Sequence, residues 1–422
     1  MQRLKNLKST DNQAPVLRLP FIYVTIPVLN EPEGLSRLLE CARVQTYRSF
    51  KLVVCVNQPE LWWNDPAKRV ICESNAASLK LLKKWKDYPV EVIDHSSKGC
   101  GWEGKRHGVG YARKAAMDLV VKMAGPDDLI LSLDADTTFS ENYFLSIATA
   151  FSRNPEAVAM SVPYYHHRPQ DKAAYRAVLR YEIYMRYYLL NMLRIGNPYA
   201  FSALGSAMAC PVWAYKAVGG MSPKLSGEDF YFLQKLRKYG PVMLWNDEPV
   251  FPEARFSDRV YFGTGPAMIK GEGGDWSSYP IYSLHSFNEI LETNLLFPLF
   301  FLKTLKTKVT RFMSEVFAEK DPWKPLRENH SKIENFQRAC HEKMDGLRIL
   351  QYLKAENEKQ TSTDESRLFE WFDRYYSRTE IRGLKINSKK FSFENASIEE
   401  LERIRTFLFV KEMEERFNSE LE

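Results

Sequence analysis

Short apolar runs alternate with amphipathic stretches over roughly the first 150 residues of the chain. Alternation of this kind predicts an α/β fold with an open, mostly parallel sheet flanked by helices. The run Leu129–Leu133 is almost wholly apolar, as is typical of a central strand covered on both faces. The runs that predict strands are Phe21–Pro27, Phe50–Val56, Pro89–Asp94 and Leu129–Leu133.

Helical spacing of apolar residues follows these runs. The first helix is expected to have Asn30 or Glu31 as its cap and Pro32 in its first turn. Further helices are predicted at about 104–123, 175–193 and 230–239.

The pattern of apolar and polar residues changes at two points in the second half of the chain. Residues 251–286 are rich in Gly, Pro, Ser and aromatic residues, which predicts a long loop of the kind that is usually functional. From about Asn288 the pattern is helical and charged, and the last helix opens with the capping box Ser397-x-x-Glu400. We therefore expect an N-terminal extension (1–20), an α/β domain (21–287, with halves at 21–137 and 138–287) and a helical C-terminal region (288–422).

The composition narrows the class of protein. Hydrophobic residues make up 45% and charged residues 27% of the 422 residues, a balance typical of a soluble globular protein. The net charge of +6 is not gathered into a dense basic run, which argues against nucleic-acid binding and suits anionic ligands or lipid headgroups. Residues 1–11 lack the apolar core of a secretion signal, and the longest apolar run, Leu295–Leu302, is too short to span a membrane. A cytoplasmic location is expected, with peripheral contact at the inner face of the cell membrane left open.

Two aspartates, Asp134 and Asp136, follow the buried run Leu129–Leu133 directly. Side chains at i and i+2 point the same way while the chain stays extended. Ligands of open α/β sheets bind beyond the carboxyl ends of the strands, and Mg²⁺ or Mn²⁺ binds carboxylates together with substrate phosphates. The pair is a candidate metal site, and the alternative is a polar loop in which one aspartate caps the next helix.

A second acidic pair, Glu228 and Asp229, precedes the helix predicted at 230–239. A carboxylate there can accept a proton from an attacking hydroxyl, as a general base must. The alternative is a helix cap formed by Ser226 and Asp229, since acids favour helix N-termini whatever their function. Taken alone, this motif favours the cap.

The glycine-rich turn Gly99–Gly104 matches two phosphate-binding patterns incompletely. It fits G-x-G-x-x-G but follows the third strand, and Arg106 stands where a P-loop needs a hydroxyl. With Lys105, Arg106 and Arg113 leading into a helix, the turn is a candidate cradle for a diphosphate. An ordinary basic surface loop is an equal alternative.

Three residues near the predicted loop complete the candidates. Arg255 and Arg259 have the chemistry to clamp a phosphate, although a solvated charged surface explains them equally well. His285 is a candidate further metal ligand, weighed against an ordinary polar residue.

Taken in order, these segments resemble the family-2 glycosyltransferases with the GT-A fold over about residues 21–245. The segments that carry the resemblance are Val24–Glu31, Leu38–Glu40, Gln45–Tyr47, Gly110–Lys114, Asp134–Asp136, Gly205–Ala207, Gly219–Met221 and Gly227–Asp229, with Leu236 and Gly240 beyond.

The resemblance implies an inverting, metal-dependent enzyme that moves a sugar from a nucleotide-diphosphate donor to an acceptor hydroxyl. It implies that Asp134 contacts the donor ribose or the metal and that Asp136 binds the metal. Asp229 is then the base, with Glu228 as the reserve. The donor is of the UDP or GDP type, and the acceptor is a glycan, a lipid or a small molecule. The donor-binding residues that it implies are Pro27, Asn30, Glu31, Asn57, Lys105, Arg113 and Asp134.

The sequence departs from the family pattern in two places. Many members end the second strand with an acid pair that binds the nucleobase, whereas this chain has Val56-Asn57-Gln58, so the base stays open and Asn57 is expected to bond it through its amide. The Gln-x-x-Arg-Trp motif of processive synthases is absent after the acidic motif, which favours addition of single sugars.

Two other functions remain as alternatives. A nucleotidyltransferase acting on a sugar phosphate shares the sheet and the paired acids, although its glycine-rich loop usually follows the first strand. A non-catalytic scaffold with a degenerate GT-A domain is the second, and it predicts no response to a nucleotide diphosphate.

Overall fold

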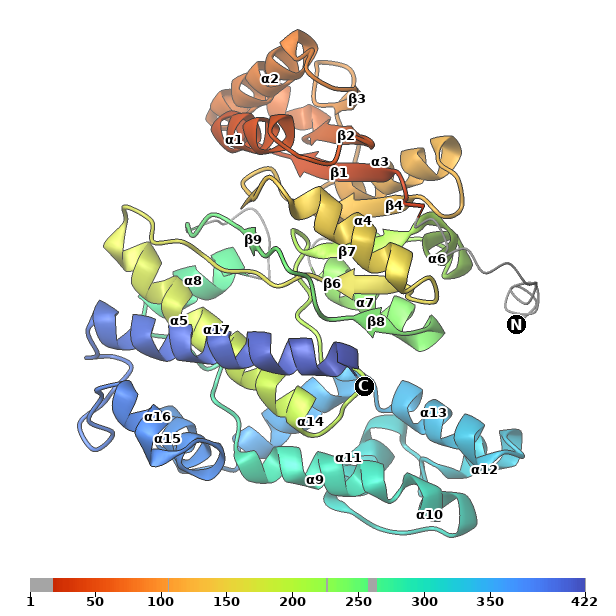
Figure 1. The fold of residues 1–422 in the computed structure, drawn as a ribbon, viewed down its shortest axis with the longest axis vertical. Coiled ribbons are helices and arrows are strands. Elements are labelled where there is room, and N and C mark those ends of the chain that lie inside the picture. The colour runs from red at the N-terminus through yellow and green to blue at the C-terminus, as the bar shows by residue number, and fades with distance from the viewer. Residues whose placement is uncertain (1–17, 105, 225–226, 257–263, 422) are drawn as a thin grey trace, which may run out of the picture.

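The computed structural model describes residues 18–104, 106–224, 227–256 and 264–421. Its upper part in Figure 1 is an α/β layer, and its lower part consists of helices that follow residue 284 in the sequence. The last helix returns and lies across the middle of the molecule.

The centre of the upper part is a seven-stranded sheet made of β3 (Val90–His95), β2 (Phe50–Asn57), β1 (Ile22–Val28), β4 (Leu129–Ser132), β7 (Met208–Pro211), β6 (Ala159–Ser161) and β8 (Val242–Met243), in that spatial order. The first four strands are parallel, β7 is antiparallel to β4 and β6, and β6 pairs with β8 in parallel. Val24 of β1 is paired with Leu52 of β2 and Leu131 of β4, and all three are fully buried. The predicted open, mostly parallel sheet is confirmed.

Helices cover both faces of this sheet. α1 (Pro32–Arg43) and α4 (Tyr143–Arg153) share one hydrophobic core with one face. α3 (Val109–Met123) packs on the other face, where the core continues into the lower helices. Completing this part are α2 (Arg69–Lys84), α5 (Lys172–Arg194), α6 (Val212–Ala217), α7 (Glu228–Tyr239), α8 (Thr264–Glu272), the short helices η2 (Glu60–Asn64) and η3 (Pro66–Lys68), and the paired strands β5 (Thr138–Phe139) and β9 (Val250–Phe251).

Two predictions about local structure need correction. The helix predicted from about residue 104 begins at Val109, directly after Gly108, whose φ of 103° lies in a region that favours glycine. The loop predicted for residues 251–286 contains α8 and the start of the next helix. Ala267 and Met268 of α8 are fully buried, and the helix packs on α5. This tertiary contact outweighs the low helix propensity of a segment that contains Gly and Pro.

The lower part is helical, as predicted for the C-terminal region. The capping box at the start of its last helix is confirmed, because Ser397 N donates to Glu400 Oε2 (2.8 Å) and Glu400 N donates to Ser397 Oγ (3.1 Å). The helices are α9 (Leu284–Leu295), α10 (Phe297–Leu302), α11 (Lys308–Phe317), α12 (Lys324–Asn329), α13 (Ile333–Lys343), α14 (Gly346–Asn357), α15 (Asp364–Tyr375), α16 (Arg378–Gly383) and α17 (Ile398–Leu421).

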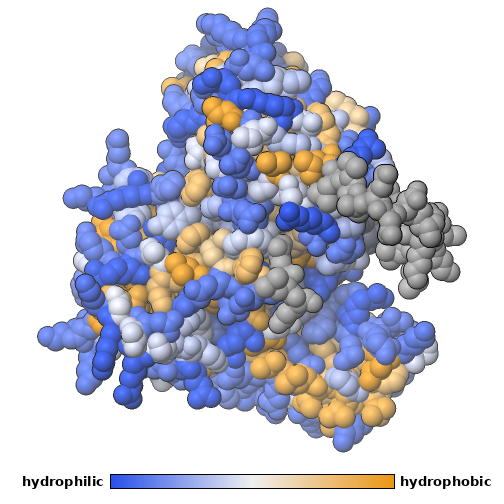
Figure 2. Space-filling model, in the orientation of Figure 1, coloured by the Kyte–Doolittle hydropathy of each residue, from blue (hydrophilic) through white to orange (hydrophobic). Residues whose placement is uncertain are grey.

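The surface in the view of Figure 2 is mostly hydrophilic, and hydrophobic residues gather at its lower right, where α10 lies in Figure 1. None of the helices in the described part of the chain combines the length and the apolar character needed to cross a bilayer.

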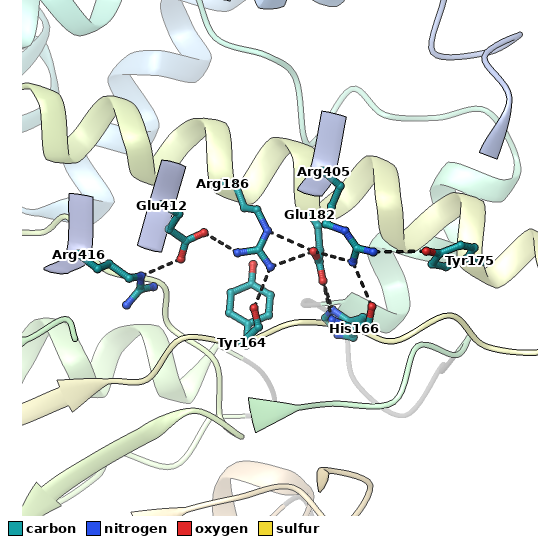
Figure 3. Close-up of polar contacts among 8 residues, drawn as sticks. All are labelled: Tyr164, His166, Tyr175, Glu182, Arg186, Arg405, Glu412 and Arg416. Atoms are coloured by element: carbon teal, nitrogen blue, oxygen red, sulfur yellow. Dashed lines mark hydrogen bonds and ion pairs between the residues drawn. The ribbon is translucent and has the colours of Figure 1, made fainter. Parts of the chain in front are cut away.

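A row of buried, ion-paired side chains connects α17 to α5 (Figure 3). Arg186 of α5 donates to Glu182 on its own helix (2.9 Å) and to Glu412 of α17 (2.5 Å). Arg405 donates to Glu182 (3.1 Å), and Arg416 donates to Glu412 (2.8 Å). All five side chains are fully buried. We call Glu182, Arg186, Arg405, Glu412 and Arg416 the charged ladder.

The charged ladder also reaches the main chain that connects β6 to α5. Arg416 donates to Ser161 O (2.9 Å), Arg186 to Tyr164 O (2.8 Å) and Arg405 to His166 O (3.0 Å). The last helix thus holds in place a segment of the second half of the α/β domain.

Candidate active site

The two aspartates after β4 lie at the end of the central strand but turn toward different partners. β4 ends at Ser132, and the chain then turns, with Thr137 N donating to Asp134 O (3.1 Å). Asp134 binds Arg113, and Asp136 binds Arg255. The expected extended backbone, with both carboxylates pointing the same way, is therefore replaced by a turn that gives each carboxylate its own cation.

Arg113 of α3 connects the two acidic motifs. Its Nη2 donates to Asp134 Oδ1 (2.8 Å), and its Nε donates to Glu228 Oε1 (3.2 Å). Its Nη1 donates to Ser132 Oγ (2.5 Å) and to Gly205 O (2.8 Å). Only 2% of the side chain is exposed. Arg113 is therefore a buried clamp between carboxylates rather than part of a phosphate cradle on the glycine-rich turn.

Gly205 leaves the room that this clamp requires. A Cβ atom at Gly205 would lie 2.2 Å from Nη2 of Arg113, closer than any side chain allows. The packing of Arg113 thus explains why position 205 is a glycine, and the Gly205 carbonyl also accepts a hydrogen bond from this arginine.

The second acidic pair opens α7, directly after Gly227. Glu228 is 4% exposed and bound by Arg113, whereas Asp229 Oδ1 accepts the N–H of Phe230 (2.7 Å). Burial, and then the neighbouring Glu228, raise the pKa of Asp229 to about 7, although Arg113 acts in the opposite direction. Asp229 is therefore a carboxyl group that exchanges a proton near neutral pH.

Arg255, on the chain after β9, joins Glu31 to Asp136. Its Nη2 donates to Asp136 Oδ2 (2.7 Å) and to Glu31 Oε2. Burial raises the pKa of Asp136, as do Asp134 and Glu31, and Arg255 lowers it in part. The sequence suggested a phosphate clamp for Arg255, and the structure places it beside Glu31 and Asp136, which were predicted to bind the donor and the metal.

The remaining donor-side candidates line the ends of β1 and β2. Pro27 is buried in β1 beside Cys55 of β2. Asn30 has a positive φ of 54°, and its N–H donates to Asn75 Oδ1 (2.8 Å). Asn57 is 2% exposed, and its Nδ2 donates to Val28 O (2.9 Å). The Asn57 amide nitrogen thus donates to β1, and contact of this amide with a base edge stays a prediction.

The glycine-rich turn binds a protein carboxylate. Gly99 N and Gly101 N donate to the two carboxylate oxygens of Glu60, each at 2.8 Å. The turn was a candidate cradle for a diphosphate, with an ordinary surface loop as the alternative, and two of its N–H groups bind Glu60. Lys105 and Arg259 lie outside the described residues.

His285 does not join the carboxylates. It lies in the first turn of α9, with its Nε2 3.1 Å from Glu289 Oε1 and 3.4 Å from Lys308 Nζ. In Figure 1, α9 is at the bottom of the molecule, whereas β4 is in the upper part. The prediction of His285 as a metal ligand is therefore wrong. In the described ranges no three His, Cys, Asp or Glu side chains are grouped to hold an ion.

The sequence named Gly205 and Arg255 but not their partners, and it did not single out Ser132. Ser132 and Gly205 bind Arg113, and Arg255 binds Glu31 from 224 positions away. The apolar strand before Ser132, the segment Gly205–Ala207 and the candidate clamp Arg255 were visible in the sequence, and none of them indicates a partner.

Known proteins resemble the chain in part. No curated protein matches it. Among solved structures, it is similar to S. aureus TarS 1–349 in complex with UDP-GlcNAc (14% identity, TM-score 0.40, covering 77% of this chain and 91% of that one). It is also similar to the mannosyltransferase PcManGT from Pyrobaculum calidifontis in complex with GDP-Man and Mn²⁺ (15% identity, TM-score 0.39, covering 98% and 93%). The family described as "Glycosyl transferase family group 2" matches residues 129–263. This match includes both acidic motifs and Arg255, and over those residues it confirms the resemblance to the family-2 glycosyltransferases.

Proposed function

We propose that the protein transfers a single sugar from a UDP- or GDP-type donor to an acceptor hydroxyl at this carboxylate cluster. The observation that carries the proposal is the guanidinium of Arg113, which binds Asp134 at the tip of the central strand and Glu228 at the start of α7. A donor at the strand end and an acceptor at α7 would then meet at one point. The family match over residues 129–263 supports the same reaction.

Asp136 and Asp134 suit a divalent cation. The pKa of Asp136 is raised by burial, by Asp134 and by Glu31, and Arg255 lowers it by a smaller amount. Further positive charge beside Asp136 would therefore be stabilising. Mg²⁺ is commonly held by one or two carboxylates plus substrate phosphate oxygens, so a larger protein ligand set is not needed. We assign Asp136, with Asp134, as the protein ligands of Mg²⁺ or Mn²⁺. The bound ion would offset the charge of the diphosphate leaving group.

Asp229 is the better candidate for the base. Its pKa near 7 leaves a large fraction ionised at neutral pH, so it can take the proton of an acceptor hydroxyl. Glu228 is bound to Arg113 and is 4% exposed, which suits a positioning role. In the proposed step the acceptor oxygen bonds to the anomeric carbon, the bond from that carbon to the phosphate oxygen breaks, and Asp229 receives the proton. The nucleoside diphosphate leaves, and the anomeric configuration is inverted.

A screen of nucleotide sugars with Mn²⁺ tests this function through release of nucleoside diphosphate. We expect Asp136→Ala to abolish turnover, and Asp229→Ala to slow transfer while donor binding is retained. The control is Asp87→Ala, an exposed acid on the surface before β3.

The same assay separates the two alternatives. Release of inorganic diphosphate from a nucleoside triphosphate would identify a nucleotidyltransferase instead. If no nucleotide sugar is hydrolysed and no nucleotide diphosphate shifts the melting temperature, the scaffold interpretation replaces the enzyme.

A further inference from the structure

Three exposed leucines form a ridge at the corner between α9 and α10. Leu299 and Leu302 are three residues apart on α10 and share one face of that helix, and Leu295 is the last residue of α9, at the corner before it. They are 70%, 42% and 74% exposed, whereas Phe297 and Phe300 on the other face are fully buried. We call these three residues the leucine ridge. α10 is thus apolar on both sides, and only one side has found a partner among the described residues.

The buried side of α10 fixes this orientation. The Phe297 and Phe300 rings pack on Trp323, with centroids 5.3 Å and 5.6 Å apart, and Trp323 is itself fully buried. Rotating α10 to hide the leucine ridge would expose these rings, so the ridge faces outward because of the packing behind it.

Positive charge follows the leucine ridge along the chain, and the nearest preceding acid is the exposed Glu292. Residues 295–311 contain Lys303, Lys306, Lys308 and Arg311 and no acidic residue. Lys308 is paired with Glu289 (2.5 Å), and Lys303, Lys306 and Arg311 are exposed. Figure 2 shows the hydrophobic gathering at the lower right of the molecule, in the region of α10. Contiguous exposed apolar surface on a soluble protein generally marks an interaction site.

We propose that the leucine ridge, with Lys303, Lys306 and Arg311, docks the protein on an anionic lipid bilayer. Leucines that enter the headgroup boundary beside lysines that meet anionic headgroups are the usual elements of interfacial binding. A second copy of the chain fits less well, because a two-fold contact would bring the same cations face to face. The proposal concerns contact from one side of the membrane and does not depend on the reaction at the carboxylate cluster.

Sedimentation with vesicles tests the docking directly. The full-length protein is mixed with vesicles of phosphatidylcholine and phosphatidylglycerol in equal amounts, or of phosphatidylcholine alone. We expect binding to the mixed vesicles, and we expect the triple variant Leu295→Ser, Leu299→Ser, Leu302→Ser to bind about tenfold or more weakly. The double variant Lys303→Glu, Lys306→Glu should lose about as much affinity and lose most of the preference for phosphatidylglycerol.

Matched controls lie at the opposite end of the molecule. Leu61 is 72% exposed on η2, and Lys83 and Lys84 are exposed at the end of α2. Leu61→Ser, and Lys83→Glu with Lys84→Glu, should bind vesicles as the unmodified protein does. Equal binding by the ridge variants, or none by the unmodified protein, would overturn the proposal. So would a dimer in sedimentation velocity that the leucine substitutions dissociate.

Discussion

At the residue scale, the protonation of Asp229 sets a pH dependence that can be measured. The half-buried carboxyl group of Asp229 lies beside Glu228, and its pKa is raised to about 7. If Asp229 accepts the acceptor proton, the turnover rate should rise with pH through about 7 and level off above it. The pH profile of kcat with a saturating donor checks this, and Asp229→Asn should slow turnover and remove its rise with pH. A profile that is flat across this range in the unmodified enzyme would exclude Asp229 as the base.

The raised pKa of Asp229 also makes the stability of the protein depend on pH. Stability should fall as pH rises, whereas turnover should increase. The folded pKa lies above the usual 3.8, so folding favours the protonated carboxyl group. This contribution is present at low pH and is lost as pH rises through about 7. Asp229→Asn should therefore gain in melting temperature relative to the unmodified protein on going from about pH 5 to about pH 8. Asp87→Asn, at an exposed site, should show no such trend.

The residues that the sequence identified are those whose signal is local. Asp134, Asp136, Glu228 and Asp229 stand in short motifs next to a strand or a helix start, and the structure links both motifs through Arg113. The bond from Arg255 to Glu31 spans 224 positions and is made by the fold, so no local pattern could predict it. The prediction of His285 as a metal ligand was wrong for the same reason, because its neighbours Glu289 and Lys308 belong to the lower helices and no local pattern shows this.

At the scale of elements, the charged ladder makes α17 depend on α5. Removing one partner of a buried ion pair leaves an uncompensated charge, which typically costs about 3–5 kcal/mol. Glu412→Ala would leave both Arg186 and Arg416 without this carboxylate, so we expect a loss of that size in the free energy of unfolding. Urea denaturation followed by circular dichroism measures it.

Glu414, two residues further along α17, is the matched control. It pairs with Lys411 at 2.9 Å, but its side chain is 54% exposed. Glu414→Ala should change the free energy of unfolding by less than about 1 kcal/mol. Similar losses for the two variants would mean that the charged ladder does not stabilise the contact between α5 and α17.

Helices and strands could be predicted from the sequence where their cause is local, and could not be predicted where it depends on distant residues. The strands β1 to β4 were visible as apolar runs, because most of them lie in the core, and the helices α3, α5 and α7 were visible as periodic faces, because one face of each meets the core. α8 was missed, since its helical state depends on burying Ala267 and Met268 against α5. The charges of α17 were visible, but their burial was not, because Arg186 and Glu412 are 226 positions apart.

At the scale of the whole molecule, the α/β layer and the lower helices share one hydrophobic core. Its members extend from Val53 of β2 to Leu408 of α17, and the ring of Tyr187 on α5 packs on Trp371 of α15 with centroids 5.1 Å apart. A chain truncated after residue 287 would expose this surface. We expect it to lose cooperative thermal unfolding in circular dichroism, which the full-length protein should retain. A truncated chain that keeps a sharp, reversible melt would show that the α/β domain is stable alone.

The shared position of Arg113 implies a coupling between the two sides of the cluster. One guanidinium serves both Asp134 and Glu228, so a ligand that draws Asp134 away changes what Arg113 offers to Glu228. Thermodynamic linkage is reciprocal. If a ligand bound at Asp134 changes the affinity for a ligand at Glu228 by some factor, the second ligand changes the affinity for the first by the same factor. Affinity at the two acidic motifs is thereby tied to a single cation buried between them.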